Sequence, residues 1–237
     1  MVRGESAKLL YVGSIPTRAL KMNKRRYLLN EKFFDKWSSE MAYILGFWFA
    51  DGYMRHEKSY RIVFASKDYH LLLQIRNCLG SNHPIYRRKD GTGDQLIIFS
   101  KQIYLKLLAL GGKRCKSKII RFPRVPYKHL PDFIRGYFDG DGSVFHTTYI
   151  HTKTKRPRTE LRSNFTSGSP KFLEDLQNAL VNNLGAIKKK ICSYNKGASW
   201  KLGYGTYDTL KLLQFMYYPN YSVGLERKAA FLGKRGN

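Results

Sequence analysis

The sequence predicts an α+β protein made of two tandem copies of one αββαββα unit. Three observations predict this class. An aromatic, glycine-containing segment that ends in Asp-Gly occurs twice, at residues 43–52 and 133–142. Further matching segments follow each copy in the same order. Each copy also carries the same succession of amphipathic helices and short strands, separated by glycine-containing turns.

The repeat is defined by matching residues whose separation grows along the chain. At an offset of 90 the identical pairs are Ile44 and Ile134, Gly46 and Gly136, Asp51 and Asp141, and Gly52 and Gly142. The segment "RIVFAS" (61–66) then resembles "RSNFTS" (162–167) at an offset of 101, and "YLKLL" (104–108) matches "TLKLL" (209–213) at an offset of 105. Landmarks in one order with a growing offset indicate duplication followed by insertions.

The elements of each copy follow from local patterns. In the first copy we expect a helix at about 41–51, a strand at 60–66, an amphipathic helix at 67–80, strands at 83–89 and 95–100, and a last helix that carries LKLL. In the second copy we expect a helix at 131–140, strands at 143–150 and 160–166, a helix at 169–185, strands at 186–194 and 200–205, and again a helix that carries LKLL.

Four segments are therefore expected along the chain. They are a basic N-terminal extension (1–40), a first repeat (41–112), a linker rich in Lys, Arg and Pro (113–130), and a second repeat (131–237).

The charge balance indicates a polyanionic partner. The chain of 237 residues has 43 Lys and Arg against 17 Asp and Glu, a formal net charge of +26. Such an excess destabilises a compact protein by self-repulsion unless a partner neutralises it. Basic residues extend from Arg3 to Arg235, which favours a broad folded surface over a basic tail, and nucleic acid is the expected partner.

Cysteine usage and hydropathy favour an intracellular protein. Cys78, Cys115 and Cys192 are far apart and lack zinc-ligand spacing, which suits a reducing compartment. No apolar run has the length of a membrane span, and the basic N-terminus lacks a signal-peptide core. We expect the cytoplasm or nucleoid of a prokaryote, or an organelle matrix, with a transit peptide left open.

The two Asp-Gly helices carry a feature that folding alone does not require. Glycine destabilises a helix interior by roughly 0.5–1 kcal/mol relative to alanine, so Gly46 and Gly136 suggest a seam where two helices approach closely. Asp51 and Asp141 then emerge together at helix C-termini, where negative charge is unfavourable. A turn residue before a C-terminal glycine is the alternative interpretation, but its repetition in both copies favours a shared cation such as Mg²⁺.

The segments "ILGFWFADG" (44–52) and "IRGYFDGDG" (134–142) resemble the two motif helices of the LAGLIDADG homing endonucleases. The resemblance covers about 190 residues, roughly 41–233. It implies a monomer with pseudo-two-fold symmetry, in which an antiparallel β-saddle and two central motif helices straddle double-stranded DNA. It also implies Mg²⁺-dependent cleavage of both strands at a long specific site, leaving 3′ overhangs.

The resemblance also implies site residues. Asp51 and Asp141 hold metal, assisted by the backbone carbonyls of Ala50 and Gly140. Mn²⁺ is expected to substitute for Mg²⁺, and Ca²⁺ to support binding without cleavage. The sequence departs from the family pattern at Phe49, where the first motif often has an acid.

The counterpart of Phe49 in the second copy, Asp139, is therefore not required by a symmetric mechanism. We expect Asp139 to form a salt bridge or to act as an N-cap in the turn.

The family further uses one basic residue in each half near the active site. By position these are Lys116 and Lys228, with Lys118 and Arg227 as alternates. For each of them an ordinary solvated side chain is the competing interpretation.

The strands suggest which residues face DNA, because alternate side chains of a strand point to opposite faces and a two-stranded ribbon fits the major groove. Ile62, Phe64 and Phe165 are expected to face the core. The candidate DNA contacts are Arg61, Arg87, Arg88, Lys89 and Gln95 in the first copy, and Arg162, Asn164, Thr166, Lys188, Lys190 and Lys201 in the second.

Several alternatives stay open at the level of sequence. The same scaffold could serve an intron maturase or a DNA-binding regulator that does not cut, or the chain could be a ribosome-associated structural protein. The six histidines show no HNH-type pattern, and "LYVGS" (10–14) is only half of a GIY-YIG motif. The chain ends lack intein splice-junction residues, which favours a free-standing or intron-encoded enzyme. We expect no obligate protein partner.

Overall fold

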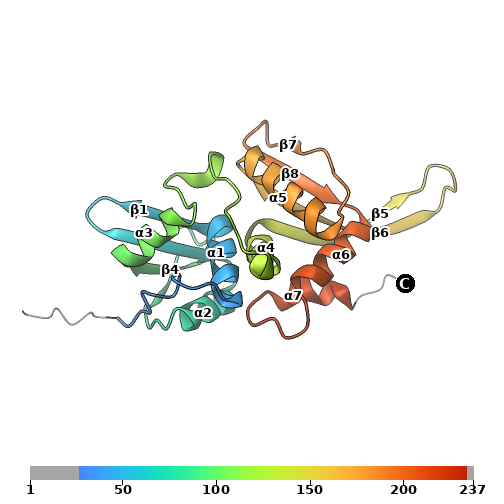
Figure 1. The fold of residues 1–237 in the computed structure, drawn as a ribbon. Coiled ribbons are helices and arrows are strands. Elements are labelled where there is room, and N and C mark those ends of the chain that lie inside the picture. The colour runs from blue at the N-terminus through green and yellow to red at the C-terminus, as the bar shows by residue number, and fades with distance from the viewer. Residues whose placement is uncertain (1–26, 234–237) are drawn as a thin grey trace, which may run out of the picture.

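Two four-stranded antiparallel sheets lie on either side of a pair of central helices in the computed structural model, which describes residues 27–233 (Figure 1). The first half contains α1 (Ser39–Asp51), β1 (Gly52–His56), β2 (Tyr60–Ser66), α2 (Tyr69–Cys78), β3 (Ile85–Arg87), β4 (Asp94–Phe99) and α3 (Lys101–Ala109). The second half contains α4 (Leu130–Asp141), β5 (Gly142–Ile150), β6 (Pro157–Ser167), α5 (Pro170–Leu184), β7 (Cys192–Tyr194), β8 (Ser199–Tyr204), α6 (Thr206–Met216) and α7 (Glu226–Ala229). Short 3₁₀ turns occupy Lys116–Lys118, Tyr127–His129 and Ala230–Leu232.

The two sheets have the same topology. Their strand orders are β1-β2-β4-β3 and β5-β6-β8-β7, and every pairing is antiparallel. In each half the strand begins at the glycine that ends the motif helix, since Gly52 pairs with Phe64 and Gly142 pairs with Phe165. The predicted α+β class with duplicated αββαββα units is therefore confirmed.

One face of each sheet is covered by helices and forms the core. Helices α2 and α3 pack on the first sheet, and α5 and α6 pack on the second. Ile62, Phe64 and Phe165 are fully buried on these covered faces, as their alternation predicts. Burial of each such side chain stabilises the folded protein by about 1.5–3 kcal/mol. The face of each strand that carries the alternating apolar residues therefore turns toward the core.

Two strand predictions need correction. β1 follows α1 directly at "GYMRH", a segment that lies outside all the predicted strands. The predicted strand at 186–194 is wrong for 186–191, because only Cys192–Tyr194 joins the sheet. Instead, Gln177 of α5 accepts a hydrogen bond from the Lys189 N–H at 2.8 Å and donates one to the Lys189 carbonyl at 3.0 Å. These bonds satisfy the backbone groups that a strand partner would have used.

Part of the predicted N-terminal extension packs on the first half. Phe34 is buried, and the Asn30 N–H donates to the Leu79 carbonyl at 2.9 Å. The rest of that extension, residues 1–26 with the segment at 10–14, lies outside the described residues. Within residues 27–233, no helix has both the length and the apolar character needed to cross a bilayer.

Candidate active site

Helices α1 and α4 cross in close backbone contact at two glycines. A β-carbon added at Gly46 would lie 2.0 Å from the Phe133 carbonyl oxygen, and one added at Gly136 would lie 2.0 Å from the Tyr43 carbonyl oxygen. Real β-carbons do not approach a carbonyl oxygen so closely, so any side chain at either position would push the helices apart. The crossing therefore depends on glycine in both halves.

The crossing brings the C-terminal ends of the two helices together. Asp51 is the last residue of α1 and Asp141 the last of α4. A β-carbon added at Gly140 would lie 3.2 Å from the Asp51 carboxylate oxygen and 2.4 Å from the Ala50 side chain. The two motif ends thus touch, and the absence of a side chain at Gly140 leaves room for the Asp51 carboxylate.

A buried lysine lies against each motif end. The Lys116 ammonium donates to the carbonyls of Phe49 and Ala50, at 2.5 and 2.8 Å. The Lys228 ammonium donates to the Asp139 carbonyl at 3.1 Å, to the Gly142 carbonyl at 2.7 Å and also to the Phe138 carbonyl. Carbonyls at a helix C-terminus lack intrahelical partners and carry partial negative charge, so both lysines satisfy and neutralise these ends.

The alternate basic candidates make no hydrogen bond to the carbonyls of the motif ends. Lys118 is exposed in the short turn that begins at Lys116, whereas Arg227 lines the groove beside the motif ends. Neither replaces the ammonium contacts that Lys116 and Lys228 make. The structure thus places both predicted lysines against the motif ends, where their charges act on both aspartates, while the alternate Arg227 lines the groove nearby.

The protonation equilibria of these groups are strongly displaced. Loss of hydration raises the pKa of Asp51, while the charges of Lys116 and Lys228 oppose the rise. Loss of hydration, and next the charge of Asp51, raise the pKa of Asp141 to about 7. Burial lowers the pKa of Lys116 and of Lys228 to about 8, with nearby aspartates opposing it. The folded protein therefore confines two carboxyl groups that resist simultaneous ionisation.

These oxygens suit a hard divalent cation. Mg²⁺ is usually bound through one or two carboxylates, with waters and substrate phosphates completing its shell. Among residues 27–233 no cluster of three or more His, Cys, Asp and Glu side chains could hold a metal, so a cation here would draw on two carboxylates and on backbone carbonyls. The Ala50 carbonyl also accepts from Lys116, which leaves one lone pair of that oxygen available.

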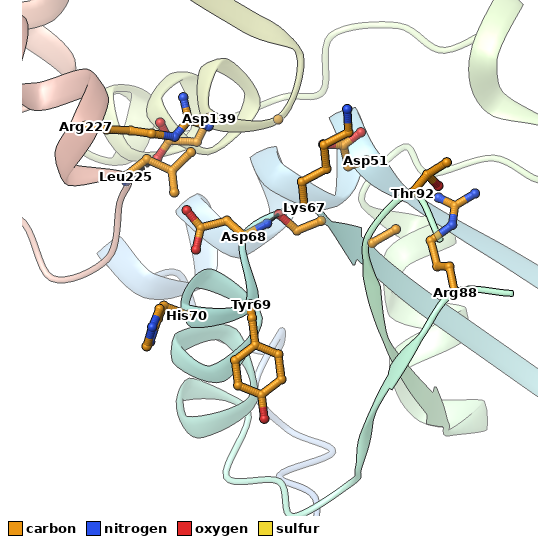
Figure 2. A pocket seen from close by; sticks show the side chains of 13 residues that line it. Asp51, Lys67, Asp68, Tyr69, His70, Arg88, Thr92, Asp139, Leu225 and Arg227 are labelled. Atoms are coloured by element: carbon orange, nitrogen blue, oxygen red, sulfur yellow. Dashed lines mark hydrogen bonds between the residues drawn. The ribbon is translucent and has the colours of Figure 1, made fainter. Parts of the chain in front are cut away.

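An open groove of about 700 Å³ runs beside the motif ends and is lined from both halves (Figure 2). Asp51, Lys67, His70 and Arg88 come from the first half, and Arg227 from the second. Lys67 and His70 were not among the predicted site residues. Lys67 lies in the turn between β2 and α2 and His70 in the first turn of α2, and this position in the sequence could have identified them. Asp68 lies between them and caps α2, since its carboxylate accepts a hydrogen bond from the Leu71 N–H at 3.2 Å.

Asp139 lines the same groove, but its carboxylate is used in hydrogen bonds that stabilise the fold. Its carboxylate accepts hydrogen bonds from the Tyr43 hydroxyl at 2.8 Å, the Tyr217 hydroxyl at 2.5 Å and the Leu225 N–H at 2.9 Å. The expected N-cap or salt bridge is therefore wrong for Asp139, which sits in the last turn of α4. A buried carboxylate is stabilised by several donors at once, and here they come from α1 and from the C-terminal segment.

In the first sheet the candidate DNA residues divide between the two faces. The register places Arg61 and Gln95 on the face opposite the core, together with Arg55. Arg87 pairs with Asp94, and the register places it on the same face of the sheet as the core residues. It is nevertheless exposed, because it lies at the end of β3. Arg88 and Lys89 follow in the turn after β3.

In the second sheet the strand candidates share one face. Arg162, Asn164 and Thr166 alternate along β6, and Lys201 pairs with Thr166. They lie opposite the face that buries Phe165 and Leu202. A cavity of about 520 Å³ opens on this face, and its lining includes Arg162, Asn164 and Lys201. Lys190 also lines it from the irregular segment before β7, where Lys188 is exposed.

Comparison with curated proteins gives one partial relative. An 89-residue stretch is 38% identical to the probable translation initiation factor IF-2 of Thermococcus kodakarensis. That stretch is 36% of this chain and 7% of the relative, so the chain spans only a small part of the protein it matches.

Several solved structures with a similar fold are homing endonucleases. Mesophilic variants of the homing endonuclease I-DmoI share 21% identity at a TM-score of 0.55, covering 85% of this chain and 98% of theirs. I-LtrWI bound to target DNA shares 14% at a TM-score of 0.53, covering 84% and 87%. I-SmaMI bound to cleaved DNA shares 15% at 0.55, covering 83% and 87%.

The match to a family profile covers both halves of the chain. The profile of the LAGLIDADG-like domain matches residues 38–111 and again residues 131–210. The matched segments begin beside α1 and α4 and include both glycine crossings and both aspartates. The chain therefore belongs to the LAGLIDADG-like domain family, with two copies of the domain in one polypeptide.

Proposed function

We propose that this protein is a site-specific homing endonuclease that cuts both strands of a long DNA target. The observation that carries the proposal is the meeting of Asp51 and Asp141, two carboxyl groups with raised pKa, at the ends of crossing helices. Folding alone gains nothing from placing two dehydrated acids together. In a phosphodiester-cleaving centre, a bound divalent cation would neutralise the two carboxylates and take part in the reaction.

The cation of this centre is proposed to be Mg²⁺, with Mn²⁺ as a substitute and Ca²⁺ as a cation that supports binding without cleavage. Asp51 and Asp141 would hold it, with the carbonyls of Ala50 and Gly140. When bound, it supplies activation of water and stabilisation of the leaving oxygen.

Lys116 and Lys228 hold the helix ends in place and bring positive charge to the site where the anionic backbone must enter. Their lowered pKa leaves part of each lysine population neutral near pH 8, so each could also accept a proton there.

Double-stranded DNA is proposed to lie across the uncovered faces of both sheets. The net charge of +26 supports this, as do the arginines and lysines on those faces. Arginine and glutamine side chains there suit base edges, and lysines suit phosphates. Because both halves are in one chain, a monomer presents both faces, and the boundaries 41–112 and 131–237 are proposed for the two repeats.

A cleavage-site selection tests this function. The full chain is incubated with a randomised duplex library and Mg²⁺, and cut molecules are captured and sequenced. We expect one long consensus with staggered ends that carry 3′ overhangs, and no cutting in EDTA. If the same library yields bound but uncut molecules under every cation, the chain binds DNA without cleaving it and the endonuclease assignment is wrong.

A further inference from the structure

The first hairpin of the second sheet is longer than its counterpart in the first sheet. The β1–β2 ladder has five pairs, from Gly52 and Phe64 to His56 and Tyr60. The β5–β6 ladder has nine, from Gly142 and Phe165 to Ile150 and Pro157. Because both ladders start at the glycine after the motif helix, the four added pairs lie at the outer end.

The added residues account for the growth of the repeat offset from 90 to 101. Each strand of the hairpin is four residues longer, and its loop has six residues (151–156) where the first hairpin has three (57–59). The extension is thus a single insertion into the hairpin, and the rest of the sheet keeps its topology.

The outer part of this hairpin extends beyond the other elements, and only its inner end packs on them, where Leu161 is buried and the rings of His146 and Phe231 lie 5.5 Å apart. β8 pairs with β6 only between Ser163 and Ser167, so residues 146–150 and 157–161 form a ribbon without a third strand. Figure 1 shows β5 and β6 running outward from α4 to a yellow hairpin beyond the other elements. We call residues 146–161 the outer ribbon.

The outer ribbon is ordered by its own contacts. The hydroxyls of Thr148 and Thr159 are 2.8 Å apart, and the Tyr149 hydroxyl donates to Glu160 at 2.6 Å. The His151 N–H donates to the Arg156 carbonyl at 2.9 Å and so closes the loop. An isolated two-stranded ribbon is marginally stable in water, so these contacts maintain a shape that the core does not need.

The surface of the outer ribbon suits a polyanion. Its loop and outgoing strand contain Lys153, Lys155, Arg156 and Arg158, all exposed. Its single acid, Glu160, is engaged by Tyr149 and by Arg162, whose guanidinium lies 3.1 Å away. Ile150 near the tip is 60% exposed, so the ribbon also offers an apolar side chain to a partner.

The ribbon continues the candidate DNA face. Tyr149 and Arg158 form a cross-strand pair, and their parity along β5 and β6 is that of Arg162 and Asn164. Residues two apart on a strand share a face, so the face that carries the cavity beside Lys201 extends to the tip of the ribbon.

We propose that the outer ribbon enters the major groove of the target beyond the reach of the first half, so that the DNA site is longer on the second-half side. Four added residues per strand extend the ribbon by about 13 Å, at roughly 3.3 Å per residue. At about 3.4 Å per base pair this is about four base pairs. A two-stranded ribbon fits the major groove. The inference rests on the proposed function, because that function places DNA on this face.

A hydroxyl-radical footprint on the selected target tests the inference. One variant replaces residues 148–159 with Asn-Gly, a two-residue turn that joins Thr147 to its partner Glu160. A second keeps the length but removes charge: Lys153→Gln, Lys155→Asn, Arg156→Gln and Arg158→Gln. Asparagine is used at 155 because Lys155 has φ 54°, a left-handed conformation that asparagine tolerates. The matched control in the first hairpin is Arg55→Gln with Lys58→Gln.

We expect the shortened variant to lose protection over about four base pairs at one edge of the footprint while cutting continues at the same position. The charge variant should weaken binding about tenfold or more. It should also reduce the log–log salt slope by about 0.9 for each phosphate that the ribbon no longer neutralises. The control should alter the opposite edge only.

If both ribbon variants give the same footprint as the unaltered chain, the inference is wrong, but the endonuclease proposal is unaffected. The same holds if the variants keep full DNA binding but lose binding to an RNA or protein probe. Absence of any specific footprint from the unaltered chain overturns both proposals. If the shortened variant does not fold, the charge variant decides.

Discussion

The two motif helices share the residues that meet at the centre but differ in the polar groups that they bury. All the buried residues of α1 are apolar or glycine, whereas α4 buries Asp132, Arg135 and Asp139. Both helices keep the crossing glycine, the terminal aspartate and a lysine against the last carbonyls. The duplicated halves are therefore alike where they share a site and have diverged where each half packs against its own neighbouring segments.

The divergence has a physical reason in how each lysine is delivered. Lys116 lies in the segment that leads into α4, and the Ile120 carbonyl near it accepts from the Ser169 hydroxyl at 2.7 Å. Lys228 follows a long segment after α6. The Arg135 guanidinium holds that segment by donating to the Met216 carbonyl at 2.7 Å and the Val223 carbonyl at 2.9 Å. In the first half, Lys116 is positioned by the linker that leads directly into α4. In the second half, Arg135 of α4 positions the segment that carries Lys228.

The largest effect is expected at Arg135. Arg135→Met leaves two buried backbone carbonyls without this donor and leaves the Asp132 carboxylate with the Tyr218 hydroxyl but without its ion-pair partner. Removing one partner of a buried ion pair costs about 3–5 kcal/mol. Urea unfolding measures this loss. The control, Arg121→Gln, removes an exposed pair with Asp175 and should change stability far less. Equal losses for the two variants would show that the second half does not depend on this cluster.

The next largest effect is expected at the shared crossing. Gly46→Ala and Gly136→Ala should each reduce the free energy of unfolding by about 1–3 kcal/mol, because the new methyl group meets a carbonyl oxygen on the other helix. The losses should be similar, since the two environments are alike. Gly203→Ala is the control, because its nearest neighbour would lie 3.8 Å away. If only one of the two variants loses stability, the two glycines do not contribute equally to the crossing.

The aspartate pair predicts a pH dependence of stability without metal. The pKa of Asp141 is about 7 in the folded protein against 3.8 for an ordinary aspartate, so the folded state binds more protons between these values. Stability therefore falls as pH rises through this window, and Asp141→Asn should remove that fall. In EDTA the variant should gain at least about 1.4 kcal/mol over the parent between pH 4 and pH 7, the equivalent of one pKa unit.

That gain is measured by urea unfolding at both pH values. Asp35→Asn, at an exposed carboxylate 3.7 Å from the Lys106 ammonium, is the matched control for loss of a surface carboxylate. A parent whose stability rises with pH in step with Asp141→Asn would contradict the placement of Asp141 beside Asp51.

The smallest effect is expected at the caps of the equivalent helices α3 and α6. The Ser100 side chain caps α3 by accepting from the Ile103 N–H at 3.2 Å, whereas α6 begins after Gly205 with no side-chain cap. Gly205→Ser should stabilise the protein by a few tenths of a kcal/mol. The position has φ −84° and open space around its α-carbon, so serine fits. A destabilised variant would show that the two caps are not interchangeable.

The sequence predicted the centre of the molecule well because its signals there are local and repeated. The first motif helix ends at Asp51 as expected, and the second ends at Asp141, one residue beyond the predicted end, because glycine follows each aspartate. The core parity of Ile62 and Phe64 followed from strand alternation. The proposed catalytic roles of the aspartates and lysines stay predictions.

The sequence predicted less where tertiary contacts decide. The short β7 depends on Gln177, a residue of another element that binds the Lys189 backbone. The role of Asp139 depends on Tyr217 and Leu225, which are 78 and 86 residues away along the chain. Neither partner is visible in a local pattern, so single segments of the sequence could not identify them.

The most direct test of the account is cutting of a plasmid that carries the selected site. The parent chain, Asp51→Asn, Asp141→Asn and the control Asp35→Asn are compared in Mg²⁺, with binding followed separately in Ca²⁺. We predict that the parent and Asp35→Asn produce linear DNA, while each motif variant binds the site but yields no linear product. Undiminished linear product from either motif variant would contradict the claim that the two aspartates form one cutting centre.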